Sequence, residues 1–288
     1  MKAVELDGIA KVFLPALSGA PFHALTEINL SIAEGEIVGL LGPNGSGKTT
    51  LLKIIMGLVA PTAGACRVFG RPSHCAETRS SVGYLPEAPE FYPFLTGIEL
   101  LRFFAGLAGL AGRIREDRIK EAIALVGLGT ASARRVGTYS RGMKQRIGLA
   151  QALVTSPRLV ILDEPTANLD PEGASDIGEI IRGIRARGGT VLLSSHQLDQ
   201  IEDLCTRVVL LNRGRLVASG TIDELLQSHR ENTLVVESLP EADESELRVW
   251  LANRGARLRS APFARRGGLE RVYLAAAHRC YSDESECP

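Results

Sequence analysis

The amino-acid sequence predicts an α/β fold with a mostly parallel β-sheet at its core. Apolar, strand-like segments alternate with helical patterns along most of the chain, and this alternation is typical of a parallel sheet covered by helices on both faces. Two segments mark the ends of such strands. A glycine-rich stretch, GLLGPNGSGKTT (39–50), links an apolar strand to a leucine-rich helix, and a second apolar strand, LVILDEP (159–165), ends in two acids.

The other elements follow from the periodicity of apolar residues. Strand-like patterns occupy residues 2–9, 25–32, 36–42, 65–70 and 81–86, and a loop with two prolines and a glycine (13–23) separates the first two. Helical patterns at 98–110, 115–128 and 141–154 predict an all-helical insert over about residues 88–156. Alternation then resumes, with helices from 173 and 197, a hairpin that turns at 212–214, and a last helix that Thr221 is expected to cap.

Composition and charge limit the classes of function. The chain has 288 residues, 45% of them hydrophobic, and its 33 Lys and Arg residues balance its 33 Asp and Glu residues. The net charge therefore favours neither an anionic membrane surface nor a nucleic acid as a partner, and no nucleic acid partner is expected. No apolar run reaches the roughly 18 residues that a membrane helix needs, so we expect a soluble chain made in the cytosol. Five cysteines without a C-x-x-C pair predict reduced thiols.

The glycine-rich stretch matches a phosphate-binding loop. Residues 42–49 fit the spacing G-x-x-x-x-G-K-S/T between a strand and a helix. Successive backbone N–H groups and the helix N-terminus form a concavity suited to a polyphosphate, and glycines keep side chains out of it. Lys48 can reach the β- and γ-phosphates, and the Thr49 hydroxyl can bind Mg²⁺. The predicted ATP-binding residues here are Gly42, Pro43, Asn44, Gly45, Ser46, Gly47, Lys48, Thr49 and Thr50.

The acids after the second strand suit the hydrolysis of a bound triphosphate. Asp163 ends the strand and can hold Mg²⁺, directly or through water. Glu164 projects differently and can deprotonate a water aimed at the γ-phosphate. His196 follows the next strand, where an imidazole can contact the same phosphate. We therefore predict an ATPase with Glu164 and His196 as catalytic residues, and with ATP and Mg²⁺ as cofactors.

A second phosphate-binding helix start lies in TYSRGMKQRIGLAQAL (138–153). Ser140 caps this helix and Gly142 lies in its first turn, where open N–H groups and the positive end of the helix dipole can meet an anion. With this segment in place, the order and spacing of the motifs resemble those of the ATP-binding cassette (ABC) family over about residues 1–230. The resemblance implies a P-loop NTPase cassette with an antiparallel β-subdomain beside the parallel sheet.

The same resemblance implies that two cassettes meet head to tail as a homodimer. Each ATP would lie between the 42–49 loop of one chain and the Ser140–Gly142 helix start of the other. In that arrangement Asp170 of TANLD (166–170) faces the partner site, and His196 is the switch histidine. Phe13 matches the aromatic residue that stacks on adenine.

Two departures from the family pattern narrow the class. The signature segment reads YSRGM, and Glu87 replaces the usual glutamine, where it is a third candidate ligand for Mg²⁺ beside Thr49 and Asp163. Both variants resemble those of cassettes that serve ABC-2 type exporters. This resemblance implies a motor subunit that lies at the inner face of the cell membrane and contacts separate integral membrane permease subunits through residues 87–99.

Two other functions fit part of the pattern. A cassette ATPase of nucleic acid or the ribosome usually has two cassettes or a long coiled coil, which this charge-balanced chain lacks. A nucleotide-sensing regulator that binds ATP without hydrolysing it would lack the catalytic base, whereas Glu164 and His196 are both present in this sequence. The substrate stays open, because the same segments also resemble the cassette of a copper-handling system that matures nitrous oxide reductase. After residue 230 the composition shifts, and 231–288 is expected to form a small α+β appendage of unassigned role.

Overall fold

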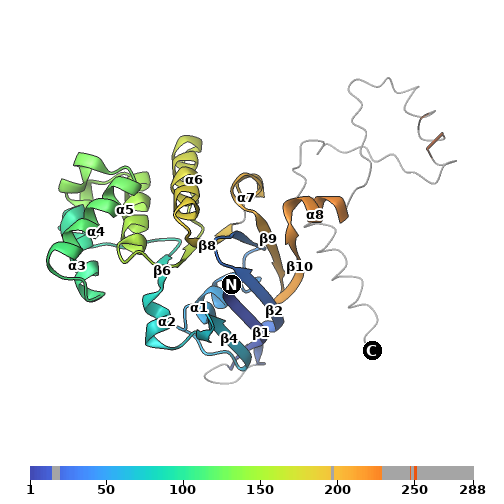
Figure 1. The fold of residues 1–288 in the computed structure, drawn as a ribbon. Coiled ribbons are helices and arrows are strands. Elements are labelled where there is room, and N and C mark those ends of the chain that lie inside the picture. The colour runs from blue at the N-terminus through green and yellow to red at the C-terminus, as the bar shows by residue number, and fades with distance from the viewer. Residues whose placement is uncertain (15–19, 196–197, 229–246, 248–249, 252–288) are drawn as a thin grey trace.

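A computed structural model describes residues 1–14, 20–195, 198–228, 247 and 250–251. Two β-sheets and the helices that cover them make up this part of the chain (Figure 1). His196, nearly all of the predicted appendage (231–288) and part of the 13–23 loop lie outside the described residues. The expectations for these segments therefore stay predictions.

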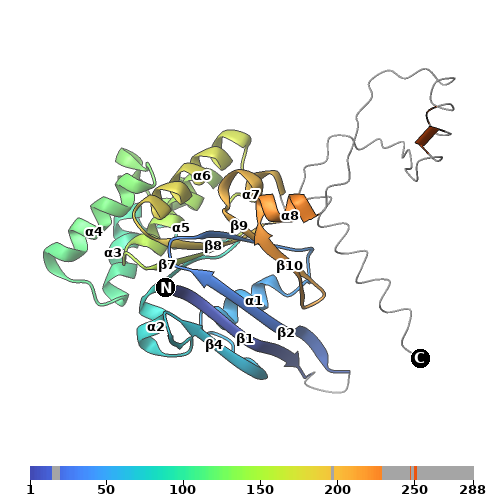
Figure 2. The ribbon, with the colours of Figure 1, turned by 45° about the vertical axis from the view of Figure 1, so that its right-hand side comes forward.

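The antiparallel sheet contains four strands in the order β2-β1-β4-β5. β1 (Lys2–Phe13) pairs with β2 (Phe22–Ala33) and with β4 (Ala63–Val68), which pairs in turn with β5 (Arg71–Pro72). This sheet lies below the larger one in Figure 2 and confirms the antiparallel β-subdomain. Both β1 and β2 extend beyond their predicted segments because they continue to pair up to Phe13 and Phe22.

The second sheet contains six strands in the order β10-β9-β3-β8-β7-β6. Every pair from β9 to β6 is parallel, and β10 at the edge pairs antiparallel with β9. The strands are β3 (Ile37–Leu41), β6 (Val82–Leu85), β7 (Leu159–Asp163), β8 (Thr190–Ser195), β9 (Arg207–Asn212) and β10 (Arg215–Thr221). This mostly parallel sheet confirms the α/β fold class, and the β9–β10 hairpin turns within the predicted residues 212–214.

The central strands are largely apolar because both faces of the sheet are covered. All residues of β3, β7 and β8 are buried, as expected for parallel strands between two layers. Val38 packs in the same apolar cluster as Leu52 of α1 (Lys48–Ile55), whereas Ile37 packs in the cluster that includes Ile181 of α6 (Pro171–Ala186). The parallel sheet is thus the middle of three layers. α1 and the antiparallel sheet cover one of its faces, and helices such as α6 cover the other.

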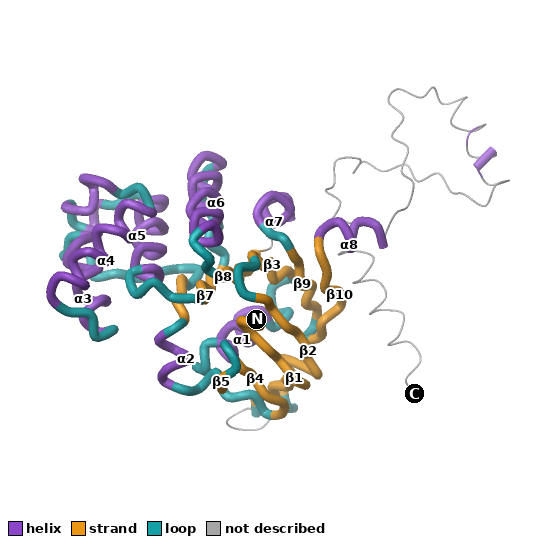
Figure 3. Tube along the Cα trace, viewed as in Figure 1, coloured by secondary structure: helices purple, strands orange, loops and turns teal. Residues whose placement is uncertain are grey.

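Three helices form where the sequence predicts the helical insert (Figure 3). α3 (Gly97–Leu107), α4 (Gly112–Leu125) and α5 (Arg141–Leu153) share one apolar cluster, with short 3-10 helices at Gly129–Ala133 and Val136–Thr138. The structure also describes the short helices α2 (Ala76–Ser80), α7 (Leu198–Leu204) and α8 (Ile222–Ser228). Within the described residues, no helix is long and apolar enough to cross a bilayer.

Side-chain caps set where two of the later helices begin. Asp170 accepts a hydrogen bond from the backbone N–H of Gly173 at 3.0 Å and Pro171 follows it, so α6 begins ahead of the predicted residue 173. Thr221 caps α8 as predicted, because its hydroxyl accepts a hydrogen bond from the Glu224 backbone N–H at 3.2 Å. The short elements α2 and β5 escape prediction because they span too few residues to show a period.

Candidate nucleotide site

The phosphate loop follows β3 and leads into α1, as the sequence predicts. Gly47 stands at the N-cap of α1 with a φ of 105°, a conformation that residues other than glycine rarely adopt. A Cβ on Gly42 would lie 2.2 Å from the carbonyl oxygen of Leu211 in β9, so this close approach requires glycine. The backbone N–H of Gly214 donates to the carbonyl oxygen of Ser46 at 2.9 Å. The β9–β10 hairpin therefore supports the loop in this shape.

Lys48 is the first residue of α1, and its side chain is turned into the loop. It is 8% exposed, and its ammonium donates to two loop carbonyl oxygens, the nearer being that of Gly42 at 2.6 Å. Burial lowers the pKa of Lys48, while the carboxylates of Glu164, Asp163 and Glu87 oppose that shift. The site thus holds a buried cation that is bonded to backbone dipoles and lies in the field of three acids.

One serine of β8 holds the two acids at the end of β7. The Ser194 hydroxyl donates to Oδ1 of Asp163 at 2.5 Å and accepts a hydrogen bond from the Glu164 backbone N–H at 3.0 Å. Asp163 and Glu164 are 6% and 7% exposed. Glu164 has a φ of 50°, in the left-handed region, so the chain turns sharply as it leaves the strand. The carboxylate of Asp163 and the backbone of Glu164 are therefore fixed at the carboxyl end of the parallel sheet.

One pocket brings the predicted residues of three segments together. Its lining includes residues 43–50 of the phosphate loop, Asp163 and Glu164 after β7, and Glu87 after β6. β6 and β7 are parallel neighbours, and the carboxyl ends of parallel strands meet at the same edge of a sheet. Thr49, Asp163 and Glu87, the three predicted metal ligands, consequently surround the same space.

An aromatic residue that the sequence did not single out also lines this pocket. Phe22, at the start of β2, is 60% exposed and belongs to the lining, whereas Phe13 does not. Phe13, the predicted adenine-stacking residue, pairs directly opposite Phe22 and is 42% exposed, with the Lys11 ammonium 5.0 Å from its ring centroid. Treating residues 13–23 as a hairpin connection would have revealed this pair, since a hairpin places the two aromatic residues on neighbouring strands.

The pocket fits a nucleoside triphosphate with a divalent cation. Ser46 Oγ is buried and has no hydrogen-bond partner among the described residues, so the loop contains an unsatisfied polar group. Thr49, Asp163 and Glu87 offer hydroxyl and carboxylate oxygens, which are the hard ligands that Mg²⁺ prefers. Over the part of the chain that the structure describes, no cluster of three or more acidic, histidine or cysteine residues forms a metal site by itself.

The second predicted half-site lies outside this pocket. Ser140 caps α5 by accepting a hydrogen bond from the Met143 backbone N–H at 3.3 Å, and a Cβ placed on Gly142 would meet nothing within 4 Å. Asp170 caps α6. The lining of the pocket contains none of Ser140, Gly142 and Asp170. One chain thus presents the phosphate loop with its acids in one place and the start of α5 in another.

Comparisons with known proteins agree with these motifs. A family model described as ABC transporter matches residues 25–167. An uncharacterized ABC transporter ATP-binding protein of Nostoc sp. is 43% identical, over 80% of this chain and 68% of the relative. The Nod factor export ATP-binding protein I of Rhizobium sp. is 34% identical, over 79% of this chain and 73% of the relative. A solved dimeric ATP-binding cassette in a post-hydrolysis state with ADP and phosphate has a TM-score of 0.69 and 25% identity, covering 76% of this chain and 98% of that one.

Proposed function

Because the chain belongs to the ABC transporter family and is an ATP-binding, ATP-hydrolysing subunit of that family, we propose that it drives an ABC-2 type exporter. In this proposal two copies form a head-to-tail dimer that ATP closes and hydrolysis reopens. Separate membrane permease subunits convert this motion into transport and choose the substrate. The cassette binds them at the cytoplasmic face of the membrane.

The pocket between the phosphate loop and β7 carries the chemistry of this proposal. The loop N–H groups bind the triphosphate, and Lys48 balances the charge of its β- and γ-oxygens. Thr49, Asp163 and Glu87 hold Mg²⁺, which neutralises further phosphate charge when bound. Glu164 accepts a proton from the attacking water, and His196 contacts the γ-phosphate. The fixed positions of Asp163 and Glu164 beside the loop are the observation that supports these roles.

The absence of the α5 start from the lining of its own chain's pocket supports the head-to-tail dimer. The start of α5 offers free N–H groups and the positive end of a helix dipole, yet Ser140 and Gly142 do not line their own chain's pocket. In the dimer, the start of α5 covers the phosphate loop of the partner, and Asp170 faces the partner's site. The dimeric state of the similar solved cassette supports the same arrangement here.

An exposed aromatic cluster near Glu87 supports contact with a membrane subunit. Tyr92, Phe94 and Phe103 are 50%, 65% and 43% exposed, and the ring of Tyr92 lies 5.8 Å from that of Phe94 and 5.9 Å from that of Phe103. Aromatic residues that are exposed together are typical of protein interfaces. Residues 87–99 with Phe103 are therefore the proposed permease contact. The name of the Nod factor export relative supports export as the direction of transport.

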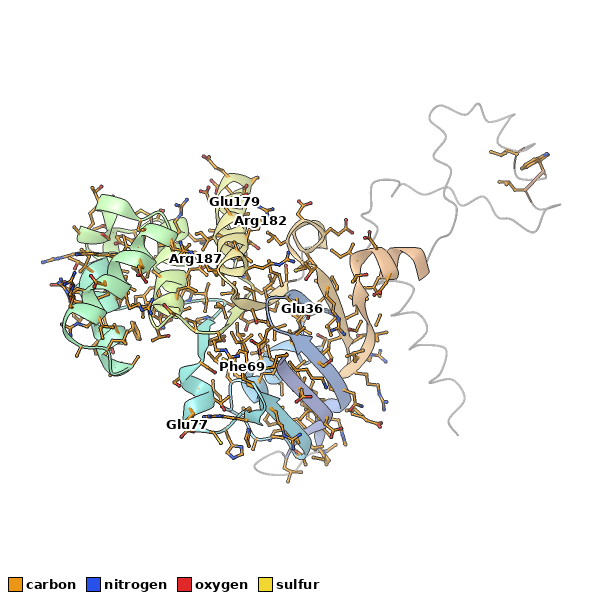
Figure 4. All side chains as sticks on the ribbon, in the orientation of Figure 1. Glu36, Phe69, Glu77, Glu179, Arg182 and Arg187 are labelled. Atoms are coloured by element: carbon orange, nitrogen blue, oxygen red, sulfur yellow. The ribbon has the colours of Figure 1, made fainter. Side chains whose placement is uncertain are left out.

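Replacing Glu164 by glutamine tests the proposed site. Glu164→Gln keeps the shape of the side chain and removes the base, so kcat should fall by roughly 100-fold or more while ATP still binds. The variant should also change from monomer to dimer on gel filtration when ATP is added, because the closed dimer forms but cannot reopen without hydrolysis. Glu179→Gln, on the exposed part of α6 (Figure 4), is the matched control and should behave like the wild type. An unchanged hydrolysis rate in Glu164→Gln would contradict the assignment.

A further inference from the structure

The first turns of α5 lie along the loop that follows Glu164. Arg141 Nη1 donates to the carbonyl oxygen of Asn168 at 3.0 Å, and Gln145 Nε2 donates to that of Pro165 at 2.8 Å. Residues four apart lie on the same face of a helix, and here the earlier helix residue meets the later loop residue. The loop therefore runs antiparallel to the start of α5, with two hydrogen bonds between them.

Arg146 extends this contact from the loop to α6. Its guanidinium forms an ion pair with the carboxylate of Asp176 and donates to the carbonyl oxygen of Val126 at 3.3 Å. Since α6 begins at the end of the same loop, where Asp170 caps it, the ion pair fixes the far side of the loop to α5. The segment from Glu164 to Asp170 is thus joined to α5 near both of its ends.

The two contacts differ in their surroundings. Gln145 is 7% exposed, so its amide and the carbonyl of Pro165 satisfy each other away from water. The side chains of Arg146 and Asp176 are 27% and 45% exposed, and a partly exposed ion pair adds little to the stability of a fold. The pair can therefore be altered without unfolding the protein, and a change in hydrolysis would then reflect the position of the loop.

We propose that Gln145 and the Arg146–Asp176 ion pair are positioning residues that couple the two ATP sites of the dimer. The inference rests on the proposed head-to-tail pairing, in which the start of α5 contacts the partner's ATP while Glu164 acts on its own chain's ATP. A shift of α5 on contact with the partner's nucleotide moves Pro165, the residue next to Glu164. Binding at one site thereby changes the placement of the base at the other, which is a coupling free energy between sites.

A charge-reversal cycle in the full chain tests this coupling. The variants are Arg146→Glu, Asp176→Arg and the two together, and the measurements are kcat, KM, the Hill coefficient for ATP and the ATP-induced shift in melting temperature. Each single reversal should lower kcat by about fivefold, the small end of allosteric couplings, and bring the Hill coefficient to that of independent sites. The shift in melting temperature should stay, because the pocket is intact. The double reversal should restore kcat and the Hill coefficient, since it re-forms the pair with opposite polarity.

An ion pair within α6 supplies the matched control. Arg182 donates to Glu179 at 2.5 Å and both side chains are largely exposed (Figure 4). Arg182→Glu and Glu179→Arg should leave every measured quantity at its wild-type value, because this pair does not reach α5. Gln145→Met keeps the side-chain length and removes the donor, so it should lower kcat and the Hill coefficient as the single reversals do.

The outcomes separate this inference from the proposed function. A wild-type chain that hydrolyses ATP without forming a dimer would overturn the head-to-tail pairing and the coupling together. A wild type that dimerises with ATP but has independent sites would overturn the coupling alone. So would single reversals that match the wild type, or a double reversal that fails to restore the Hill coefficient.

Discussion

Ser194 on β8 donates its hydroxyl hydrogen to Oδ1 of Asp163 on β7 at 2.5 Å. The Ser194 hydroxyl oxygen in turn accepts a hydrogen bond from the Glu164 backbone N–H at 3.0 Å. β7 and β8 are parallel, and Asp163 and Ser194 are partners in their register. The pairing of two buried strands therefore sets the position of a proposed metal ligand and fixes the start of the loop that carries the proposed base.

Removing the Ser194 hydroxyl should weaken both the fold and hydrolysis. Ser194→Ala takes the donor from a buried carboxylate, and a lost partner of this kind costs about 1–3 kcal/mol, or about 2–10 °C in melting temperature. Because residues that orient a metal ligand affect activity by about tenfold or more, kcat should fall by that amount. Ser80→Ala is the control, since that exposed hydroxyl donates only to Glu77 within α2. Wild-type melting and turnover in Ser194→Ala would show that the hydrogen bond does not matter.

Replacing Lys48 should remove ATP binding. Lys48→Ala deletes the ammonium that points into the loop, and a charge-assisted hydrogen bond to phosphate is stronger than the neutral contacts that remain. The ATP-induced rise in melting temperature, present in the wild type, should therefore vanish. Lys53→Ala, an exposed lysine on the same helix, should keep the full rise. A Lys48→Ala protein that ATP stabilises as much as the wild type would rule out the proposed contact.

Two buried thiols should resist alkylation at neutral pH. Burial raises the pKa of Cys66 to about 11 and that of Cys205 to about 12, from an ordinary 9.0. A thiol pKa that is higher in the folded than in the unfolded protein stabilises the folded state at pH values below the unfolded pKa. This stabilisation is lost as the pH rises from about 9 towards 12. Native protein treated with iodoacetamide at about pH 8, where ordinary thiols react, should be labelled at Cys75 and spared at Cys66 and Cys205. Equal labelling of all three by mass spectrometry would be evidence against this.

The sequence predicted the parts of the site that depend on local spacing. The phosphate loop, the acids that end β7 and the Ser140 cap of α5 are each written in a few consecutive residues, and the structure has them on the expected elements. The alternation of strands and helices likewise gave the mostly parallel sheet. These features follow from local backbone chemistry, which a single sequence displays directly.

The parts that escaped prediction depend on pairing between distant segments. Phe22 reaches the pocket because β1 and β2 pair across the 13–23 loop, and Ser194 meets Asp163 because β7 and β8 are in register. The hydrogen bond from Gln145 to Pro165 joins residues of different elements. No local sequence pattern indicates such contacts, because each of the two residues is typical of an ordinary strand or helix. Only the folded structure shows that they are in contact.

Substitutions of Glu87 test its proposed role as a metal ligand, since this residue replaces the family's usual glutamine and lines the pocket. It lines the pocket with Asp163 and Thr49. Its charge, with those of Glu164 and Asp163, opposes the lowering of the Lys48 pKa by burial. Burial, the charge of Asp163 and the charge of Glu87, in that order, raise the pKa of Tyr84. A carboxylate is a harder oxygen ligand than an amide and suits Mg²⁺ better. Glu87→Gln should hydrolyse ATP within a few-fold of the wild type, with a weaker dependence on Mg²⁺ concentration. Glu87→Ala should lose more, because no oxygen ligand remains at that position.

Hydrolysis measured against Mg²⁺ concentration decides between this role and a simpler one. Glu87 is also exposed, and an exposed carboxylate can serve only to solvate its loop. Glu90→Gln is the matched control, because Glu90 lies on the same loop, is exposed and does not line the pocket. If Glu87 binds the metal, the curve of Glu87→Gln shifts while that of Glu90→Gln superimposes on the wild type. If Glu87→Gln and Glu87→Ala both superimpose on the wild type, Glu87 is not at the metal.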